Sequence, residues 1–574
     1  MLYARVRSTL AGLAAFAAPL AAALAGASPA AARDVVVRSF DGTPIAASFF
    51  PAAGLKRGQR APTILESHGW GGSRDTNPDS ASSEQTGNVG LGPLRRAGFN
   101  VLTWDARGWG QSGGTIEVDS KDFEGRDVSA LLSWLARQPE ARLDRRGDPR
   151  VGMTGVSYAG GIQLVAAAID RRIDAIAPII AWHSLLTSLY KQQSVKAGWG
   201  SILYGAAAGH RTDPHITSAF TTGVTSGSFL PSDQSWFASR GPGALVRAIR
   251  VPTLLVEGTP DTLFTLQEAI TNFRTLRHDR VPAKMVWFCG GHGACLTGSG
   301  PPGHVQADVL AWLKRYVARR RSVRTGPRFE WLADDAVWRS ARHYPPKPAP
   351  PLTANGGGTL VVTPTDTSGT PISAGRAVNA VNLPVPPPAA PKLLVGAPRL
   401  SLTYSGTGSA PAGHVYAQVV DEARGLVVGN QATPLALTLD GRPHALSLPL
   451  EAIASTAAAG ARYTLQLTGG TQVYGPARFA GVISFSNVRL VLPAVAPPPR
   501  SCTTRRRVTI RLARRIVSAR VTANGHRVRV RRRHGRLVAV VRLRASTVRV
   551  RIKGRTRSGR VVRQTRVYHR CPTS

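Results

Sequence analysis

The chain is poor in cysteine, in acidic residues and in long apolar segments. It has only 4 cysteines in 574 residues, which excludes a small disulfide-dense scaffold. After residue 32, no window approaches the roughly 18 continuous apolar residues of a spanning helix, so no transmembrane segment is expected. Asp and Glu number 32 against 73 Lys and Arg, a formal net charge of +41. With 43% apolar residues, the chain is still long enough for two or three domains with real cores.

The first 32 residues form a segment of their own. Arg5 and Arg7 give a basic start, residues 10–24 are apolar apart from Pro19, and the alanines at 30–32 form an A-x-A cleavage site. This pattern predicts a signal peptide over 1–32 and an exported mature protein, extracellular, periplasmic or associated with the cell envelope. An uncleaved membrane anchor is the alternative, and Pro19 favours the signal peptide.

Residues 151–161 read VGMTGVSYAGG and predict a short buried strand, a tight turn carrying Ser157 and the start of a helix. Gly155, Ala159 and Gly160 are small, as they must be where a strained turn lifts a serine hydroxyl clear of a sheet. This pattern predicts a nucleophile elbow with Ser157 as nucleophile. The alternative is a passive serine in a strand-to-helix turn, since short glycine–serine patterns also occur by chance.

Two later junctions between strand and loop supply an acid and a base, in the order Ser, Asp, His. The apolar run 251–256 leads into a turn that presents Asp261, and the run 283–288 ends in a glycine-rich loop with His292. An alcohol is a poor nucleophile near neutral pH, so an imidazole must take its proton and a carboxylate must orient the imidazole. Asp279, Glu257 and His304 are weaker candidates, in a charged helix end, on the strand and before a helix.

Acyl transfer also needs backbone donors for the developing oxyanion. The N–H of Tyr158, directly after the nucleophile, is the first candidate. The second comes from the glycine-rich loop 68–72, HGWGG, which follows the strand 63–67 and offers the N–H of Trp70. A plain turn is the alternative for this loop.

The chain divides into regions of different composition. From 33 to 325, apolar strands alternate with helical stretches, which indicates an α/β domain with a mostly parallel sheet. Residues 183–245 interrupt the alternation and predict a helical cap. Four aromatic residues at this cap are candidates for a substrate pocket: Trp182, Trp199, Phe229 and Trp236. The alternative is that they only seat the cap on the sheet domain.

Residues 326–496 hold short alternating strands between proline-rich connectors, typical of an antiparallel β-sandwich, with no acid–base cluster of their own. Residues 500–574 differ again: from 501 onward there are 23 Arg, 1 Lys and no Asp or Glu. Arginines alternate with valines at period two, which predicts a small basic β-domain. An anionic cell-envelope polymer is its expected partner if it has one, nucleic acid is not expected, and a solvated basic surface without a partner is the alternative.

Four cysteines in an exported chain allow three pairings. Cys502 and Cys571 bracket the basic domain, and Cys289 and Cys295 flank His292, so these two pairs are the expected disulfides. A metal held by Cys289, His292 and Cys295 is the alternative, but three ligands within seven residues leave no evident fourth. We expect no metal and no cofactor.

Several motifs resemble the X-Pro dipeptidyl peptidase and cocaine-esterase-like (CocE/NonD) family of α/β-hydrolases. Residues 105–114, DARGWGQSGG, are similar to the family's D-x-R-G-x-G-x-S-x-G loop; 155–160, GVSYAG, to its G-x-S-Y-x-G; and 258–261, GTPD, to its acid turn. The resemblance covers about 35–495 and is most specific before 345. It implies an α/β-hydrolase fold with a helical cap, followed by a jelly-roll β-sandwich. Many members supply an oxyanion-hole tyrosine from the early loop, where this chain has Trp70.

Three function classes follow. We expect an exported serine hydrolase that cleaves the acyl ester or amide bond of a small ester or peptide substrate through an acyl-enzyme. The first alternative is an X-Pro dipeptidyl aminopeptidase, which must hold a substrate ammonium, and the cap offers only Asp213 and Asp233 for it. The second is a catalytically silent envelope-binding protein that kept the fold.

Overall fold

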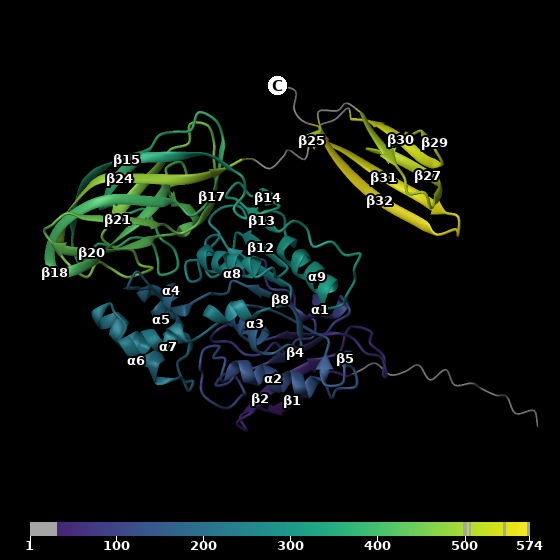
Figure 1. Cartoon of the computed structure of the whole chain (residues 1–574), viewed down its shortest axis with the longest axis horizontal. Coiled ribbons are helices and arrows are strands. Elements are labelled where there is room, and N and C mark those ends of the chain that lie inside the picture. The colour runs from purple at the N-terminus through teal and green to yellow at the C-terminus, as the bar shows by residue number, and fades with distance from the viewer. Residues whose placement is uncertain (1–30, 497–501, 504–506, 544–546, 571–574) are drawn as a thin grey trace, which may run out of the picture.

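The computed structural model describes residues 31–496, 502–503, 507–543 and 547–570, and Figure 1 shows an α/β domain with a cap, a β-sandwich and a basic β-domain. Most of the predicted signal peptide, residues 1–30, lies outside the described residues. So does Cys571, and with it the predicted Cys502–Cys571 pair. Among the described helices, none combines the length and apolarity needed to cross a bilayer.

The N-terminal α/β domain is built on a ten-stranded sheet in the order β1-β2-β4-β3-β7-β8-β11-β12-β13-β14. Strands β4 to β13 run parallel along this order, while β1, β2 and β14 pair antiparallel at the edges. The strands are β1 (Arg33–Arg38), β2 (Pro44–Phe50), β3 (Thr63–Glu66), β4 (Asn100–Trp104), β7 (Val151–Val156), β8 (Ile173–Ile179), β11 (Thr253–Gly258), β12 (Ala283–Phe288), β13 (Phe329–Leu332) and β14 (Trp338–Ala341). A small hairpin, β5 (Leu143–Arg145) and β6 (Asp148–Pro149), precedes β7.

Helices cover both faces of this sheet. Apolar side chains of α2 (Glu124–Leu135), α3 (Tyr158–Ile169) and α8 (Leu266–His278) form one core with the sheet. Those of α1 (Leu91–Arg96) and α9 (His304–Tyr316) form a second core. Because helices cover both faces of the sheet, central strands such as β12 are buried along their whole length. The predicted α/β fold is confirmed.

The predicted end of this domain at residue 325 is wrong. Strands β13 and β14 continue the sheet beyond β12, so the domain extends to Ala341. The physical reason is aromatic packing: Phe329 contacts Trp287 with ring centroids 4.8 Å apart, and Trp331 stacks on Phe329. Two short strands after the last helix carry too little periodicity to be separated from the next domain by sequence.

The cap lies between β8 and β11 and is helical, with a short hairpin. Its elements are α4 (Leu185–Leu189), β9 (Tyr190–Lys191), β10 (Ser194–Val195), α5 (Ala197–Ala206), α6 (Pro214–Ser226), α7 (Pro231–Ala238) and a 3₁₀ turn η1 (Gly243–Ala248). In Figure 1 the cap helices lie beside the α/β domain and below the sandwich. The sandwich holds the cap directly, because Arg478 donates to the carbonyl of Gly223 and the Ser194 and Tyr416 hydroxyls are 3.1 Å apart.

The β-sandwich is antiparallel throughout and is centred on the 23-residue strand β18. Alternate side chains of strands such as β20 enter a single core. Its elements are β15 (Pro348–Val362), β16 (Ala380–Val385), β17 (Lys392–Gly396), β18 (Arg399–Asp421), β19 (Leu426–Val427), η2 (Val428–Asn430), β20 (Thr433–Asp440), β21 (His444–Pro449), β22 (Ile453–Ala457), β23 (Tyr463–Thr468) and β24 (Gly481–Val495). Leu393 and Val495 join the core of the α/β domain, so the two domains share a packed interface.

The basic domain contains a five-stranded and a three-stranded sheet around a small valine- and isoleucine-rich core. The first sheet has the order β25-β32-β31-β27-β28 and the second β26-β30-β29. The strands are β25 (Cys502–Thr503), β26 (Arg507–Arg511), β27 (Ile516–Ala523), β28 (His526–Val528), β29 (Val530–Arg533), β30 (Arg536–Arg542), β31 (Thr547–Thr556) and β32 (Val561–Arg570).

Candidate active site

Ser157 occupies the turn between β7 and α3. Its backbone has φ 57° and ψ −118°, a conformation that non-glycine residues rarely adopt and that marks a strained elbow. The turn is possible only because its neighbours are small: a Cβ on Gly155 would lie 2.8 Å from the Cβ of Ala159, and one on Gly160 would lie 2.8 Å from the carbonyl of Ile179. The elbow thus follows from the small residues around the serine.

Asp261 and His292 approach Ser157 from the loops after β11 and β12. His292 Nε2 is 2.8 Å from Ser157 Oγ, and His292 Nδ1 is 2.6 Å from Asp261 Oδ2. Asp261 is fully buried, and its carboxylate also accepts the backbone N–H groups of His292, Leu263 and Phe264. These bonds fix the carboxylate so that one oxygen faces the imidazole. The structure therefore brings together the three side chains that the sequence singled out.

The loop that carries His292 is held at several points. Cys289 and Cys295 form a disulfide across it, with their Cα atoms 5.3 Å apart. The Gln85 amide donates to the carbonyls of Gly291 and Gly293 at 3.2 and 3.0 Å. Because the two cysteines are bonded to each other, their sulfurs do not form a metal site with His292. Gln85 lies in an irregular loop and gave no sequence signal.

Two residues of the β-sandwich also support the acid and the base. Gln431 donates to the backbone carbonyl of Asp261 at 2.8 Å, and Asn430 donates to the carbonyl of Ala294 at 2.9 Å. Both residues are buried. The sandwich is thus part of the framework that positions Asp261 and His292, a role that sequence analysis missed because no motif marks these amides.

The two predicted oxyanion donors belong to Tyr158 and Trp70, which line the same cavity as Ser157. Within the described chain, neither the N–H of Tyr158, the first residue of α3, nor that of Trp70 has a hydrogen-bond partner. The loop of Trp70 is fixed by His68, whose Nε2 accepts the N–H of Ala106 while Nδ1 lies 2.8 Å from the Gly69 carbonyl. Burial lowers the pKa of His68, so its ring stays neutral in this role. The oxyanion role of both N–H groups stays a prediction.

A cavity opens beside Ser157, between the α/β domain and the cap. It measures about 850 Å³ including its open mouth. Trp70, Tyr158 and Trp182 line one side, and cap helices supply the other. The remaining walls are almost entirely apolar: Val118, Leu185, Leu189, Val195, Ala197, Gly200, Leu203, Tyr204, Ile216, Ala219, Phe220, Val224, Phe229, Phe237, Leu263 and Phe264.

Among the described residues of the lining, Lys196 is the only ionisable side chain apart from the phenols of Tyr158 and Tyr204. Its ammonium donates to the carbonyls of Thr262 and Leu263 at 2.7 and 2.9 Å. Burial lowers the pKa of Lys196 to about 8. Its donors are directed at the backbone of the acid loop, so this lysine helps to hold Asp261 in place.

Of the four aromatic residues predicted to form a pocket, Trp182 and Phe229 line the cavity, whereas Trp199 and Trp236 do not. Trp199 is buried behind the wall, where its indole donates to Thr262 and its ring meets His292 edge-on at 5.8 Å. Trp236 packs between His215 and Arg240 inside the cap. The prediction that Trp199 and Trp236 line the substrate pocket is therefore wrong, because both side chains pack against neighbouring residues outside the cavity.

The loop 105–114 is a scaffold next to the site. Asp105 is fully buried, and both Arg74 and the N–H of Gln111 bond to its carboxylate. Arg107 makes two hydrogen bonds to Asp127, at 2.8 and 2.7 Å. The charged side chains of this loop are paired with one another or with neighbouring residues of the domain. We therefore assign the motif a structural role and not a catalytic one.

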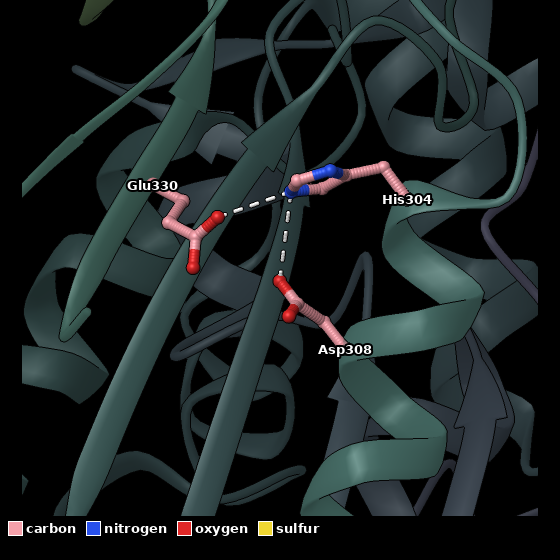
Figure 2. Close-up of side chains that lie close together, drawn as sticks. All are labelled: His304, Asp308 and Glu330. Atoms are coloured by element: carbon pink, nitrogen blue, oxygen red, sulfur yellow. Dashed lines mark hydrogen bonds and ion pairs between the residues drawn. The ribbon is translucent and has the colours of Figure 1, made fainter. Parts of the chain in front are cut away.

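A second cluster of ionisable side chains lies between α9 and β13, and Figure 2 shows His304, Asp308 and Glu330 converging there. By distance these three residues could hold a metal ion. However, the ammonium of Lys284 lies 2.8 Å from Asp308 and 2.6 Å from Glu330, and His304 Nε2 is 3.0 Å from Glu330. Since Lys284 pairs with both carboxylates and His304 bonds to Glu330, the cluster is explained as an ion-pair network that ties α9 to β12 and β13.

The arrangement at Ser157 is suited to acyl transfer. An imidazole within hydrogen-bond distance of the alcohol can take its proton, and a buried carboxylate on the far nitrogen stabilises the imidazolium that forms. The N–H of Tyr158, at the start of α3, directly follows the nucleophile and has no partner within the described chain. Beside Ser157, the cavity offers space for an apolar substituent of the substrate.

Comparisons with known proteins agree with this geometry. Residues 41–294 match the X-Pro dipeptidyl-peptidase (S15) family. A CocE/NonD family hydrolase from Staphylococcus aureus has a similar fold, with a TM-score of 0.58, 12% identity and coverage of 82% of this chain and 97% of that one. An aminopeptidase from a marine sediment Thaumarchaeota archaeon gives a TM-score of 0.59 at 13% identity, covering 81% of this chain and 96% of that one. At these identities the likeness shows the fold.

Curated relatives match over shorter stretches. The chain is 31% identical over 100 residues to an uncharacterized protein of Pseudomonas aeruginosa, which is 17% of this chain and 26% of that protein. It is 27% identical over 134 residues to the uncharacterized protein YcjY of Escherichia coli, 21% of this chain and 42% of that protein. The chain thus covers less than half of each of these relatives.

Proposed function

We propose that this protein is a serine hydrolase that cleaves acyl esters or amides through an acyl-enzyme, because residues 41–294 match the X-Pro dipeptidyl-peptidase (S15) family and the fold is similar to that of a CocE/NonD family hydrolase. One observation carries the proposal: Ser157 Oγ, His292 and the buried Asp261 form a continuous hydrogen-bonded chain at a strained elbow. In this mechanism Ser157 attacks the carbonyl, His292 acts as base and then as acid, and Asp261 orients His292. The N–H groups of Tyr158 and Trp70 hold the oxyanion.

Export is part of the proposal. The N-terminal segment has the pattern of a signal peptide, and the Cys289–Cys295 disulfide suits an oxidising compartment. The protein then meets its substrate outside the cytoplasm.

The apolar lining of the cavity favours an uncharged, apolar acyl group as the substrate rather than an X-Pro dipeptide. A dipeptidyl substrate brings an α-ammonium, which needs a carboxylate or free carbonyls to replace its water shell. No carboxylate lies among the described residues that line the cavity, and the ammonium of Lys196 faces the two carbonyls nearby. In the cap, the Asp233 carboxylate is hydrogen-bonded to His215 and Ser218, and the Asp213 side chain caps the N-terminus of α6. The X-Pro peptidase remains the alternative.

Mechanism is tested with Ser157→Ala. The variant should lose at least about 10⁴-fold in kcat/KM on a 4-nitrophenyl ester, because triad removal leaves only the oxyanion and binding contributions. A fluorophosphonate should label the wild type on Ser157 and leave the variant unlabelled. Substantial turnover by the variant would contradict the proposal, as would a wild type that is not labelled.

Substrate class is tested with a matched pair of esters, 4-nitrophenyl hexanoate and the same ester carrying a 2-amino group, beside an Ala-Pro 4-nitroanilide. We expect the unsubstituted ester to be cleaved with the highest kcat/KM. Preference for the aminoacyl ester or the anilide would instead support the peptidase alternative.

Gly200 provides a test of the cavity itself. It lines the cavity from α5, and a Cβ built on it meets nothing within 4 Å. Gly200→Leu should therefore lower kcat/KM for the hexanoate by about tenfold or more, since it occupies acyl space, while acetate hydrolysis changes little. Gly205→Leu is the control, because Gly205 lies on the same helix, is exposed and is equally open but does not line the cavity. Equal effects on both esters would place the acyl group elsewhere.

A further inference from the structure

One face of the basic domain carries an ordered set of cations, which we call the arginine face. It consists of the outward-facing residues Arg520 of β27, Arg549, Arg551, Lys553 and Arg555 of β31, and Arg563 of β32. All six are exposed, while Val548, Val550 and Ile552 alternate with them and enter the core. Strand alternation alone therefore puts a row of four cations along the central strand.

The arginine face is unfavourable for the isolated domain. Arg520, Lys553 and Arg563 lie directly opposite one another across three adjacent strands. Like charges in opposed positions of a sheet destabilise it. From residue 501 onward the sequence has no Asp or Glu, and in the described part of this domain no arginine forms an ion pair. The missing negative charge must come from solvent ions or from a partner.

Spacing and residue type restrict the partner. Successive outward residues on a strand are about 6.6–6.8 Å apart, so the row on β31 fits a chain whose anionic groups repeat at a similar interval. Guanidinium groups bind phosphate or carboxylate through two parallel hydrogen bonds, which a lysine cannot do. Thr522 and Thr565 lie opposite Arg551 on either side and add hydroxyl donors to the row.

The same face lacks the features of a nucleic-acid site. Single-stranded nucleic acid is usually held by aromatic side chains that stack on the bases, and among the described residues of the arginine face there is no aromatic ring. Tyr568 is opposite Val548 and so belongs to the core side of the sheet. A base-free polymer is therefore the better fit.

We propose that the arginine face is a binding site for a linear, base-free polyanion with repeating phosphodiester or carboxylate groups. Binding occurs along β31, with the polymer parallel to the strand and Arg520 and Arg563 closing its two sides. The proposal is independent of the catalytic role of Ser157, because the site and the polymer contact only the basic domain.

Three probes test the site on the full chain: a poly(glycerol phosphate) teichoic acid, polygalacturonate and oligo(dT). Affinity is measured over a salt series for the wild type and for the triple variant R549Q/R551Q/K553Q. We expect the variant to bind its polymer on the order of 100-fold more weakly at 50 mM salt, and the slope of log K against log salt to fall by about 2. The first two probes distinguish a phosphate from a carboxylate source.

The matched control is R507Q/R511Q/R542Q, which removes the same charge from the three-stranded sheet. It should weaken binding by less than about fivefold. Equal losses in the two triples would overturn the proposal in favour of diffuse attraction, and tightest binding to oligo(dT) would overturn it in favour of nucleic acid. If the first triple loses resistance to limited proteolysis, R549K/R551K replaces it: this variant keeps the charge, and its affinity should still fall because paired guanidinium bonds are lost.

Discussion

Arginine has opposite surroundings in the α/β domain and in the basic domain. In the first, Arg107 is almost fully buried and bonds to Asp127 and Asp41, and Arg74 bonds to the buried Asp105. In the second, Arg551 and its neighbours on β31 are exposed and have no acidic residue to meet. The same side chain thus stabilises one domain from within and leaves the other with unsatisfied charge.

The difference shows that a high net charge says little until each charge is placed. Buried arginines are fixed by carboxylates, so their loss is felt in the free energy of unfolding. Exposed arginines contribute little to that free energy and act through attraction over about 10 Å at 0.1 M salt. The α/β domain should therefore respond to pH and to point mutation, and the basic domain to salt.

The largest expected effect comes from Arg107→Ala. The change leaves Asp127 buried without its partner, so the free energy of unfolding of the α/β domain should fall by about 3–5 kcal/mol. All 11 tryptophans lie between residues 70 and 338, so their fluorescence in a urea titration reports on this domain. Arg57→Gln is the control: this arginine is exposed in the same domain, so its loss should change the same titration by less than about 0.5 kcal/mol. Similar shifts for both variants would erase the distinction between the two kinds of arginine.

A smaller effect concerns pH. Glu66 is buried at the end of β3, and burial raises its pKa to about 8 from an ordinary 4.5. The folded state therefore favours the neutral carboxyl, and its contribution to stability is complete below pH 4.5 and is lost as the pH rises through about 8. Glu66→Gln cannot ionise, so the wild type should lose stability relative to the variant between pH 5 and pH 9 in urea titrations. Parallel pH profiles would show that Glu66 is ionised in the fold.

The smallest effect is expected for a chain that ends at residue 496. Its kcat/KM on a soluble ester should stay within about twofold of the full chain, because distant sites without shared contacts act independently. Binding to the anionic polymer should disappear in the same protein. A folded truncated protein that no longer cleaves the ester would show that the basic domain contributes to the site, and the separation of the two domains would be wrong.

Ser157, Asp261 and His292 were predictable because each follows a strongly apolar strand with glycine-rich backbone, so local sequence sets both element and side chain. The residues that line the cavity were harder to predict. Trp199 and Phe229 are both buried cap aromatics, yet only Phe229 faces the cavity, and that depends on how the helices pack. Likewise Gln431 meets Asp261 only through the docking of two domains. Local sequence patterns predict whether a segment forms a helix, a strand or a loop. Tertiary packing decides which of its side chains face the active site.

The contacts of Gln431 and Asn430 with the loops of Asp261 and His292 affect when the active site is completed in a newly synthesised chain. During synthesis, Ser157, Asp261 and His292 leave the ribosome well before residues 430 and 431. Until the sandwich has been made and has docked, the carbonyls of Asp261 and Ala294 lack their amide donors and the loops are held by fewer bonds. The complete set of hydrogen bonds around Asp261 and His292 therefore forms only after residues 430 and 431 have been synthesised.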